Sequence, residues 1–184
     1  MKKILIVGSG GQIGTELVKK LRSIYGNDNV VASDLRQLTG EIVETGPFER
    51  IDSTNMMQII EVVKKYNIDT IYNLAAILSA TAELNPMLGW NVGIGSLVNS
   101  LEVARVFGCA VFTPSSIGAF GPNTPKDMTP QDTIQRPNTI YGVIFDRKYG
   151  VQFSPILNGT IYNTPSYASV LAAKICLEGF DLSE

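Results

Sequence analysis

Short apolar runs alternate with segments of helical periodicity along most of the chain. The first run, 4–7, is rich in β-branched residues, as expected of a strand buried on both faces of a parallel sheet, and further strands are expected at 30–33, 70–74 and 108–113. Between them, apolar residues recur at helical spacing over 12–23, 54–66 and 85–107. This alternation implies right-handed crossovers and predicts an α/β fold, with a doubly wound parallel sheet and helices on both faces.

Weaker patterns separate these elements. Residues 48–52 predict a short third strand, 35–46 an irregular segment, and 77–80 a loop at the carboxyl edge of the sheet. Residues 122–138, rich in Pro, Asn, Thr and Asp, predict a longer loop. Ligands of such sheets bind outside the carboxyl ends of the strands, so the residues after each strand are the first candidates for a site.

Glycines follow the first predicted strand at a spacing that suits a phosphate site. They are Gly8, Gly11 and Gly14, and the next helix starts among them with Gln12 and Ile13. Absent side chains let the backbone approach a ligand, while the free N–H groups and positive dipole end of the helix face negative charge. The stretch therefore predicts a Rossmann-like fold that holds the pyrophosphate of a dinucleotide. The alternative is that the glycines serve only a tight turn.

Acidic residues end the second and third predicted strands. Asp34 lies at the right distance from the glycines for its carboxylate to accept hydrogen bonds from a ribose diol. A 2′-phosphate would meet that negative charge, so Asp34 favours NAD over NADP, although Arg36 lies two positions on. Asp52 either accepts a hydrogen bond from the adenine amine or caps the following helix.

Small and polar residues follow the fourth strand. Leu74, Ala75 and Ala76 stand at its carboxyl end, where a cofactor could lie against the backbone. Asn91 is the polar exception on a helix whose apolar stripe, which includes Met87, suits the core or a subunit interface. An amide buried on that face needs hydrogen-bonding partners.

Hydroxyl groups are the other candidates at this edge of the sheet. Ser115 and Ser116 follow the fifth strand and are well placed to touch a substrate, whereas Ser79 either bonds a ligand or is a solvated loop serine. The chain has no histidine, which excludes Ser/His/Asp triads and His-ligated metals. Acid–base chemistry must therefore use tyrosine, lysine, carboxylates or a cofactor, and no metal site is expected.

Composition narrows the class of protein. The 184 residues are 45% hydrophobic and 17% charged, enough to bury one core of a globular domain. A formal net charge of −2 gives no basic surface for nucleic acid or anionic membranes, and no apolar run suits a signal peptide or a membrane span. We expect small-molecule partners and a cytoplasmic location. Cys109 and Cys176 lie among apolar residues in the sequence and are expected to be buried thiols.

Together these motifs resemble the extended short-chain dehydrogenase/reductase family, which includes NAD-dependent epimerases and dehydratases. The similarity rests on the glycine loop, the serine pair, Asp34, residues 73–76, Asn91 and Tyr141. A narrower resemblance, to the short-chain type of L-threonine 3-dehydrogenase, rests on residues 78–80, 114–122 and 135–143.

The resemblance implies hydride transfer from L-threonine to NAD⁺, giving 2-amino-3-oxobutanoate. It implies that Ser116, with Ser115 beside it, hydrogen-bonds the substrate hydroxyl. It also implies that Tyr141 takes the hydroxyl proton and that Ser79 contacts the amino acid. Asn91 would contact the cofactor, and a homodimer would form through the helices that carry Asn91 and Tyr141.

The chain departs from the family pattern after Val143. The family places a lysine four residues after the tyrosine, where it binds the nicotinamide ribose and stabilises the phenolate, and here that position is Phe145. A tyrosine without such a neighbour is almost wholly protonated at neutral pH, so turnover would fall by orders of magnitude. The helix carrying the tyrosine is also expected to be short, because residues 149–153 resemble the family sequence that leads into the next strand.

Several expectations about the whole chain follow from the resemblance. We expect an NAD-binding domain over 1–162 and the start of a substrate-binding lobe over 163–184, with the C-terminal substrate lobe largely absent. The chain is either a shortened, impaired relative or part of a longer working enzyme. The alternatives to threonine oxidation are a nucleotide-sugar epimerase or dehydratase and an NAD-binding remnant without catalysis.

Overall fold

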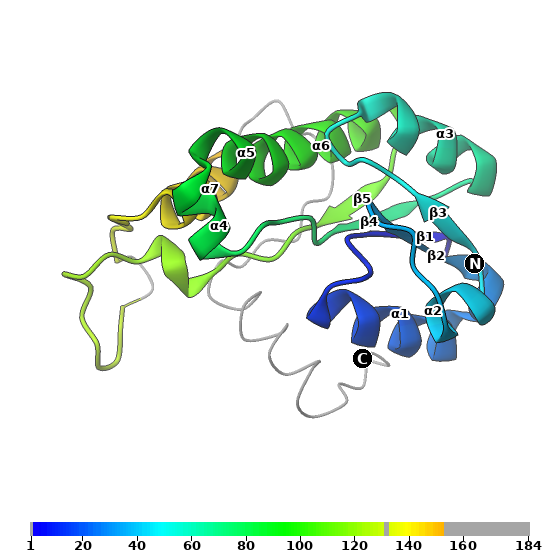
Figure 1. Ribbon diagram of the computed structural model, residues 1–184, viewed down its shortest axis with the longest axis horizontal. Coiled ribbons are helices and arrows are strands. Elements are labelled where there is room, and N and C mark those ends of the chain that lie inside the picture. The colour runs from blue at the N-terminus through cyan, green and yellow to red at the C-terminus, as the bar shows by residue number, and fades with distance from the viewer. Residues whose placement is uncertain (1, 131–132, 153–184) are drawn as a thin grey trace.

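Five parallel strands form the centre of the structure. The computed structural model describes residues 2–130 and 133–152, and within them the strands pair in the order β3-β2-β1-β4-β5 (Figure 1). They are β1 (Ile4–Val7), β2 (Val30–Asp34), β3 (Phe48–Arg50), β4 (Thr70–Asn73) and β5 (Ala110–Phe112). The order reverses direction between β1 and β4, which confirms the doubly wound parallel sheet expected from the sequence.

Helices cover both faces of this sheet. In Figure 1, α1 (Gln12–Tyr25) and α2 (Glu41–Glu44) lie on one side of it, and α3 (Met56–Tyr66) and α6 (Ser96–Phe107) on the other. The core under α1 includes Ile4, Ile6, Leu17, Val18 and Leu21. The core under α3 and α6 includes Leu5, Val7, Ile59, Val63 and Leu97. Alternate residues of β1 thus enter opposite cores, because successive strand side chains point to opposite faces.

Three helical segments follow one another without a break after β4. They are α5 (Pro86–Trp90), a π-helical turn η2 (Asn91–Gly95), and α6. Asn85 caps the series, because its Oδ1 accepts a hydrogen bond from the Leu88 amide at 3.2 Å. The helix predicted over 85–107 is confirmed in extent, with an irregular turn inside it.

Three predictions of local structure need correction. Residues 77–80, expected to be a loop, contain the start of α4 (Ser79–Leu84), and α2 lies within the segment expected to be irregular. The expectation that the helix carrying Tyr141 ends before the segment 149–153, which leads into the next strand, is also wrong, because α7 (Ile140–Gln152) continues as a helix. Packing of Ile144 and Phe145 anchors α7, and extending an anchored helix is far easier than starting one. Short 3₁₀ turns, η1 (Asn27–Asn29) and η3 (Ile117–Ala119), complete the described elements.

A buried arginine connects α1 to the strands beside it. Arg22 is only 4% exposed, and its guanidinium donates to the carbonyl oxygens of Val30, Ile42 and Pro47 and to the Thr45 hydroxyl. Burial lowers the pKa of Arg22, but backbone oxygens satisfy its donors. Arg22 therefore holds the chain that leaves β2 close to α1.

Cys109 is buried, as expected, and its thiol donates to the Ile68 carbonyl oxygen at 3.1 Å. Burial, followed by the nearby charge of Asp69, raises the pKa of this thiol. Cys176 lies outside the described residues. Within the described ranges, every helix is too short or too polar to cross a membrane.

Candidate functional site

The glycine loop brings the ends of β1, β2 and β4 together. Gly8 has φ of +86°, and its amide donates to the Ser33 carbonyl oxygen at 2.9 Å. A Cβ at Gly8 would lie 3.1 Å from the Ala75 nitrogen and the Leu74 carbonyl carbon. Glycine therefore serves this position in two ways, by its left-handed backbone and by its close approach to the chain after β4.

Gly11 and Gly14 have different surroundings. A Cβ at Gly14 would overlap Gly8 and Ser9, so this glycine lets α1 pack against the loop. A Cβ at Gly11 would meet only the Gly8 oxygen at 3.5 Å, an ordinary contact distance. Gly11 flanks the N-terminus of α1, and Gln12 and Ile13 are the first helical residues. Their amides belong to the turn that offers unpaired donors to an anion.

Asp34 is held in place by three groups. Its carboxylate accepts from the Gly10 amide at 2.9 Å and from the Arg36 amide and Nε at 3.0 Å each. Burial alone would raise the pKa of Asp34, but the hydrogen bonds from Arg36 and Gly10 outweigh it and lower the pKa. The residue is 7% exposed and ionised at neutral pH. Arg36 also donates to the Gly10 carbonyl oxygen at 3.0 Å, so it bridges the acid and the glycine loop.

A cavity of about 380 Å³ opens between these strand ends. Seven of the residues expected to bind a cofactor line it, namely Gly8, Gly11, Asp34, Asp52, Leu74, Ala75 and Ala76. Of the described residues, Gln12, Ile13, Gly14 and Asn91 lie outside its lining. The sequence did not single out Ile51, Ser53, Leu88 and Val92, which also line it. These residues read as ordinary core or helix positions, and only the fold brings them to the cavity.

Asp52 does not cap α3, so that interpretation is wrong. Asn55 caps the helix, since its Oδ1 accepts from the Met57 amide at 3.1 Å. Asp52 instead accepts from the amide and hydroxyl of Thr54, at 2.9 and 2.7 Å, and borders the cavity. Its carboxylate is therefore placed where a ligand could reach it.

The expectation of a buried amide at Asn91 is wrong. Asn91 begins the π-helical turn and is exposed. Met87, in the same continuous helical rod of α5, η2 and α6, is 68% exposed and not part of the core. Leu88 and Val92, on either side of Asn91 in the chain, are the residues that line the cavity.

Ser116 and Tyr141 come together around Gly118. A Cβ at Gly118 would lie 3.1 Å from a ring carbon of Tyr141 and 3.4 Å from Ser116 Oγ. Ser116 Oγ accepts from the Gly118 amide at 3.2 Å, and Ser115, the preceding residue, is half-buried. Ser116 and Tyr141 thus both lie against the turn at Gly118.

Helix α4 contributes to the same region. Ser79, its first residue, is exposed, and Glu83 accepts a hydrogen bond from the Tyr141 amide at 3.2 Å. Glu83 therefore satisfies a free donor at the start of α7.

The ring of Phe145 packs against Tyr141. Their centroids lie 4.7 Å apart at an interplanar angle of 49°, and Phe145 is only 5% exposed. One helical turn after the tyrosine, the chain thus places a buried aromatic ring where the resemblance leads one to expect a cation.

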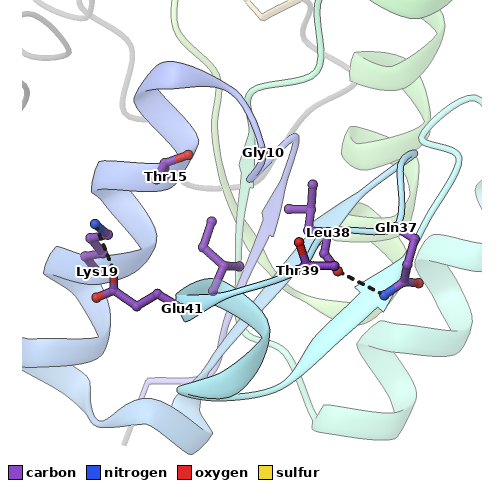
Figure 2. Close-up of a pocket in the computed structure, with 8 residues that line it drawn as sticks. Gly10, Thr15, Lys19, Gln37, Leu38, Thr39 and Glu41 are labelled. Carbon is purple, nitrogen blue, oxygen red and sulfur yellow. Dashed lines mark hydrogen bonds and ion pairs between the residues drawn. The ribbon is translucent and has the colours of Figure 1, made fainter.

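A second cavity of about 380 Å³ lies beside Gly10, between α1 and the segment before α2 (Figure 2). Lys19 and Glu41 form an ion pair of 3.0 Å at one side of it, and Thr15, Gln37 and Thr39 add polar groups. Its lining shares no residue with that of the first cavity.

Comparison with known protein families assigns the chain to one of them. The sequence model described as the NAD dependent epimerase/dehydratase family matches residues 4–144. The chain belongs to this family. The match covers the whole described sheet and ends within α7, next to Phe145.

Individual family relatives match the same region. An uncharacterized epimerase/dehydratase of Staphylococcus saprophyticus is 56% identical over 144 residues, which are 78% of this chain and 45% of the relative. The X-ray structure of L-threonine dehydrogenase from Clostridium difficile is 52% identical, with a TM-score of 0.79 over 83% of this chain and 48% of that one. The holo form of a GalE-like L-threonine dehydrogenase from Cupriavidus necator is 41% identical, with a TM-score of 0.81 over 86% and 52%. The chain spans about half the length of these relatives.

The first cavity fits NAD, the cofactor on which this epimerase/dehydratase family depends. Its volume falls in the range of small-molecule sites, and its walls combine apolar side chains with the backbone of Gly8 and Gly11. The N-terminus of α1 suits a pyrophosphate, and the ionised Asp34 suits a ribose diol.

Proposed function

We propose that this chain binds NAD⁺ in the cavity between β1, β2 and β4. The amides at the start of α1 would hold the pyrophosphate, and Asp34 would accept hydrogen bonds from the adenosine ribose. Asp52 would accept from the adenine amine, and Leu74, Ala75 and Ala76 would lie against the cofactor. The fit of the cavity and the family's dependence on NAD support this assignment.

We further propose that the protein acts on L-threonine as an NAD-dependent 3-dehydrogenase. The observation that carries this proposal is the meeting of Ser116 and Tyr141 at Gly118. The similarity to solved L-threonine dehydrogenases at 52% and 41% identity supports the choice of substrate.

In this mechanism, Ser116 and Ser115 hydrogen-bond the hydroxyl on the β-carbon of threonine and hold it towards Tyr141. The phenolate form of Tyr141 receives the hydroxyl proton and becomes the neutral phenol as the C–H bond breaks, and Ser79 contacts the amino acid. Bound NAD⁺ supplies the hydride acceptor. The hydroxyl oxygen loses its proton and the β-carbon loses a hydride, so Tyr141 and the cofactor must each reach a different atom of the same C–OH group. The relative placement of Tyr141 and the cofactor cavity therefore limits the rate.

Phe145 favours a second function, NAD binding without turnover. An apolar ring beside Tyr141 offers no charge to stabilise a phenolate and no donor for the nicotinamide ribose. In this form the chain would act as a ligand sensor or as the partner of an intact subunit.

Two measurements on the 184-residue chain separate these functions. Calorimetry with NAD⁺ tests the cofactor site, and NADH absorbance with saturating L-threonine tests turnover. Heat of binding together with NADH formation supports the dehydrogenase, and binding without NADH supports the second function. A chain that binds a sugar nucleotide and ignores threonine would instead be an epimerase or dehydratase, and absence of NAD⁺ binding would reject all three.

A further inference from the structure

Helix α7, which carries Tyr141, lies in a notch of the preceding helical rod. The notch is formed by Gly89 in α5 and Gly93 in the π-helical turn, both buried, and it receives the side chain of Ile144. A Cβ at Gly93 would overlap Ile144 Cγ2, and a Cβ at Gly89 would lie 3.2 Å from Ile144 Cδ1. Ile144 is 3% exposed, so it lies in the packed interior, where moving it displaces its neighbours.

The other side of the same helical turn is equally close-packed. Gly142 has no room for a Cβ, which would overlap the Gly118 oxygen and lie 3.0 Å from Thr139 Oγ1. Tyr141 in turn lies against Gly118, beside Ser116. The start of α7 is therefore confined between the rod and the turn η3.

Tyr141 and Ile144 are three positions apart in one helix, so they lie on neighbouring parts of its surface. A displacement that lifts Ile144 out of the notch must move the turn that carries Tyr141. Close-packed interiors transmit such shifts instead of absorbing them.

We propose that Gly93 is a positioning residue for Tyr141. The missing side chain at Gly93 sets how deeply Ile144 enters the notch, and so sets the place of Tyr141 relative to Ser116. This inference rests on the proposed function for its catalytic consequence, and on packing alone for its structural one.

The chain offers a matched control two residues away. Gly95 lies in the same π-helical turn, and a Cβ there would meet open space among the described residues. Gly93→Ala and Gly95→Ala therefore change helix propensity alike and differ in the contact with Ile144. Ile144→Leu removes the Cγ2 methyl that a Cβ at position 93 would overlap, while conserving side-chain volume.

The experiment labels the full chain with 3-fluorotyrosine and follows the ¹⁹F resonance of Tyr141, assigned by its loss in Tyr141→Phe. We expect Gly93→Ala to shift this resonance, Gly95→Ala to leave it in place, and Gly93→Ala/Ile144→Leu to return it towards the original position. Where the chain oxidises threonine, we expect Gly93→Ala to lower kcat about tenfold to a hundredfold, with NAD⁺ affinity unchanged.

The results distinguish this inference from the proposed function. An unmoved Tyr141 resonance in Gly93→Ala, or an equal shift in Gly95→Ala, overturns the positioning role whether or not the chain is active. If Gly93→Ala fails to fold, recovery of the fold and resonance in the double variant supports the role, and failure of both variants rejects it. Absence of NAD⁺ binding by the unmodified chain would reject the proposed function and leave the resonance test intact.

Discussion

Asp34 illustrates how one residue's charge depends on its neighbours. Its carboxylate is nearly buried, which by itself disfavours ionisation, and the donors of Arg36 and Gly10 reverse that effect. The folded-state pKa therefore lies below the ordinary value of 3.8. The resulting stabilisation is present above the unfolded-state pKa and is lost as the pH falls through the folded-state pKa.

We expect NAD⁺ affinity to stay constant between about pH 8 and pH 5, because Asp34 remains ionised throughout this range. Arg36→Gln removes the side-chain donor that lowers the pKa of Asp34 and leaves the burial that raises it. The variant should therefore lose affinity at a higher pH than the unmodified chain, as measured by calorimetry across the acidic range.

The control for this prediction is Arg105→Gln, which removes an arginine paired with Glu102 on α6, away from the cavity. Its pH profile should match that of the unmodified chain. Identical profiles for Arg36→Gln and Arg105→Gln would mean that Arg36 does not set the ionisation of Asp34.

Phe145 makes the contribution of a cation directly testable. We expect Phe145→Lys to increase NADH production from threonine at least about tenfold, because an ammonium group one helical turn after Tyr141 would stabilise a phenolate by more than ~1.4 kcal/mol. The matched control is Phe145→Met, which keeps an apolar side chain of similar reach. An equal rise in both variants would assign the effect to relief of packing against Tyr141.

Sequence motifs identified single residues of the first cavity, but not the other residues that line it. The glycine spacing and the strand end identified Gly8, Gly11 and Asp34, because strand, turn and helix are adjacent in the chain. Leu88 and Val92 were not predicted, because in the sequence they resemble ordinary apolar helix positions. They reach the cavity only because α5 and the π-helical turn pack beside it in the fold. Asn91 was misjudged because the π-helical turn changes which side of the rod each residue occupies.

At the scale of elements, two glycines at the junction of β1 and α1 have different roles, one in packing and one in ligand binding. Gly14→Ala should destabilise the fold by about 1–3 kcal/mol, because its Cβ would overlap the glycine loop. Gly11→Ala should change stability by less than ~0.5 kcal/mol, yet weaken NAD⁺ binding at least about tenfold, because it adds a methyl group to a residue that lines the cavity and meets only the Gly8 oxygen, at 3.5 Å. Thermal unfolding and calorimetry measure the two effects separately, and weaker binding without loss of stability in Gly14→Ala would contradict the distinction.

The sequence predicts the elements that have a strong apolar pattern of their own and misses those that depend on tertiary contacts. Strand β1 is a continuous apolar run, and burial on both faces makes that pattern unmistakable. Helix α4 has a weak apolar pattern and forms where it can pack beside α5 and α7, so its helical state depends on tertiary contacts. The extent of α7 depends in the same way on Ile144 and Phe145.

At the scale of the whole molecule, apolar side chains remain exposed along α4, α5 and α6. They include Leu84, Met87, Trp90 and Val98. The resemblance leads us to propose a homodimer through this rod and α7, since exposed apolar area of this kind commonly marks an interface.

Sedimentation velocity tests that proposal. Met87→Lys combined with Val98→Lys should shift the chain towards the monomer at micromolar concentration, because a lysine ammonium group is costly to bury in an apolar interface. Ile24→Lys, at a 42% exposed position on α1 on the other side of the sheet, is the control and should sediment like the unmodified chain. If all three proteins sediment as monomers, the rod does not mediate dimerisation of this chain. If all remain dimers, the interface lies elsewhere, and neither Asn91 nor Tyr141 would be brought close to a partner subunit.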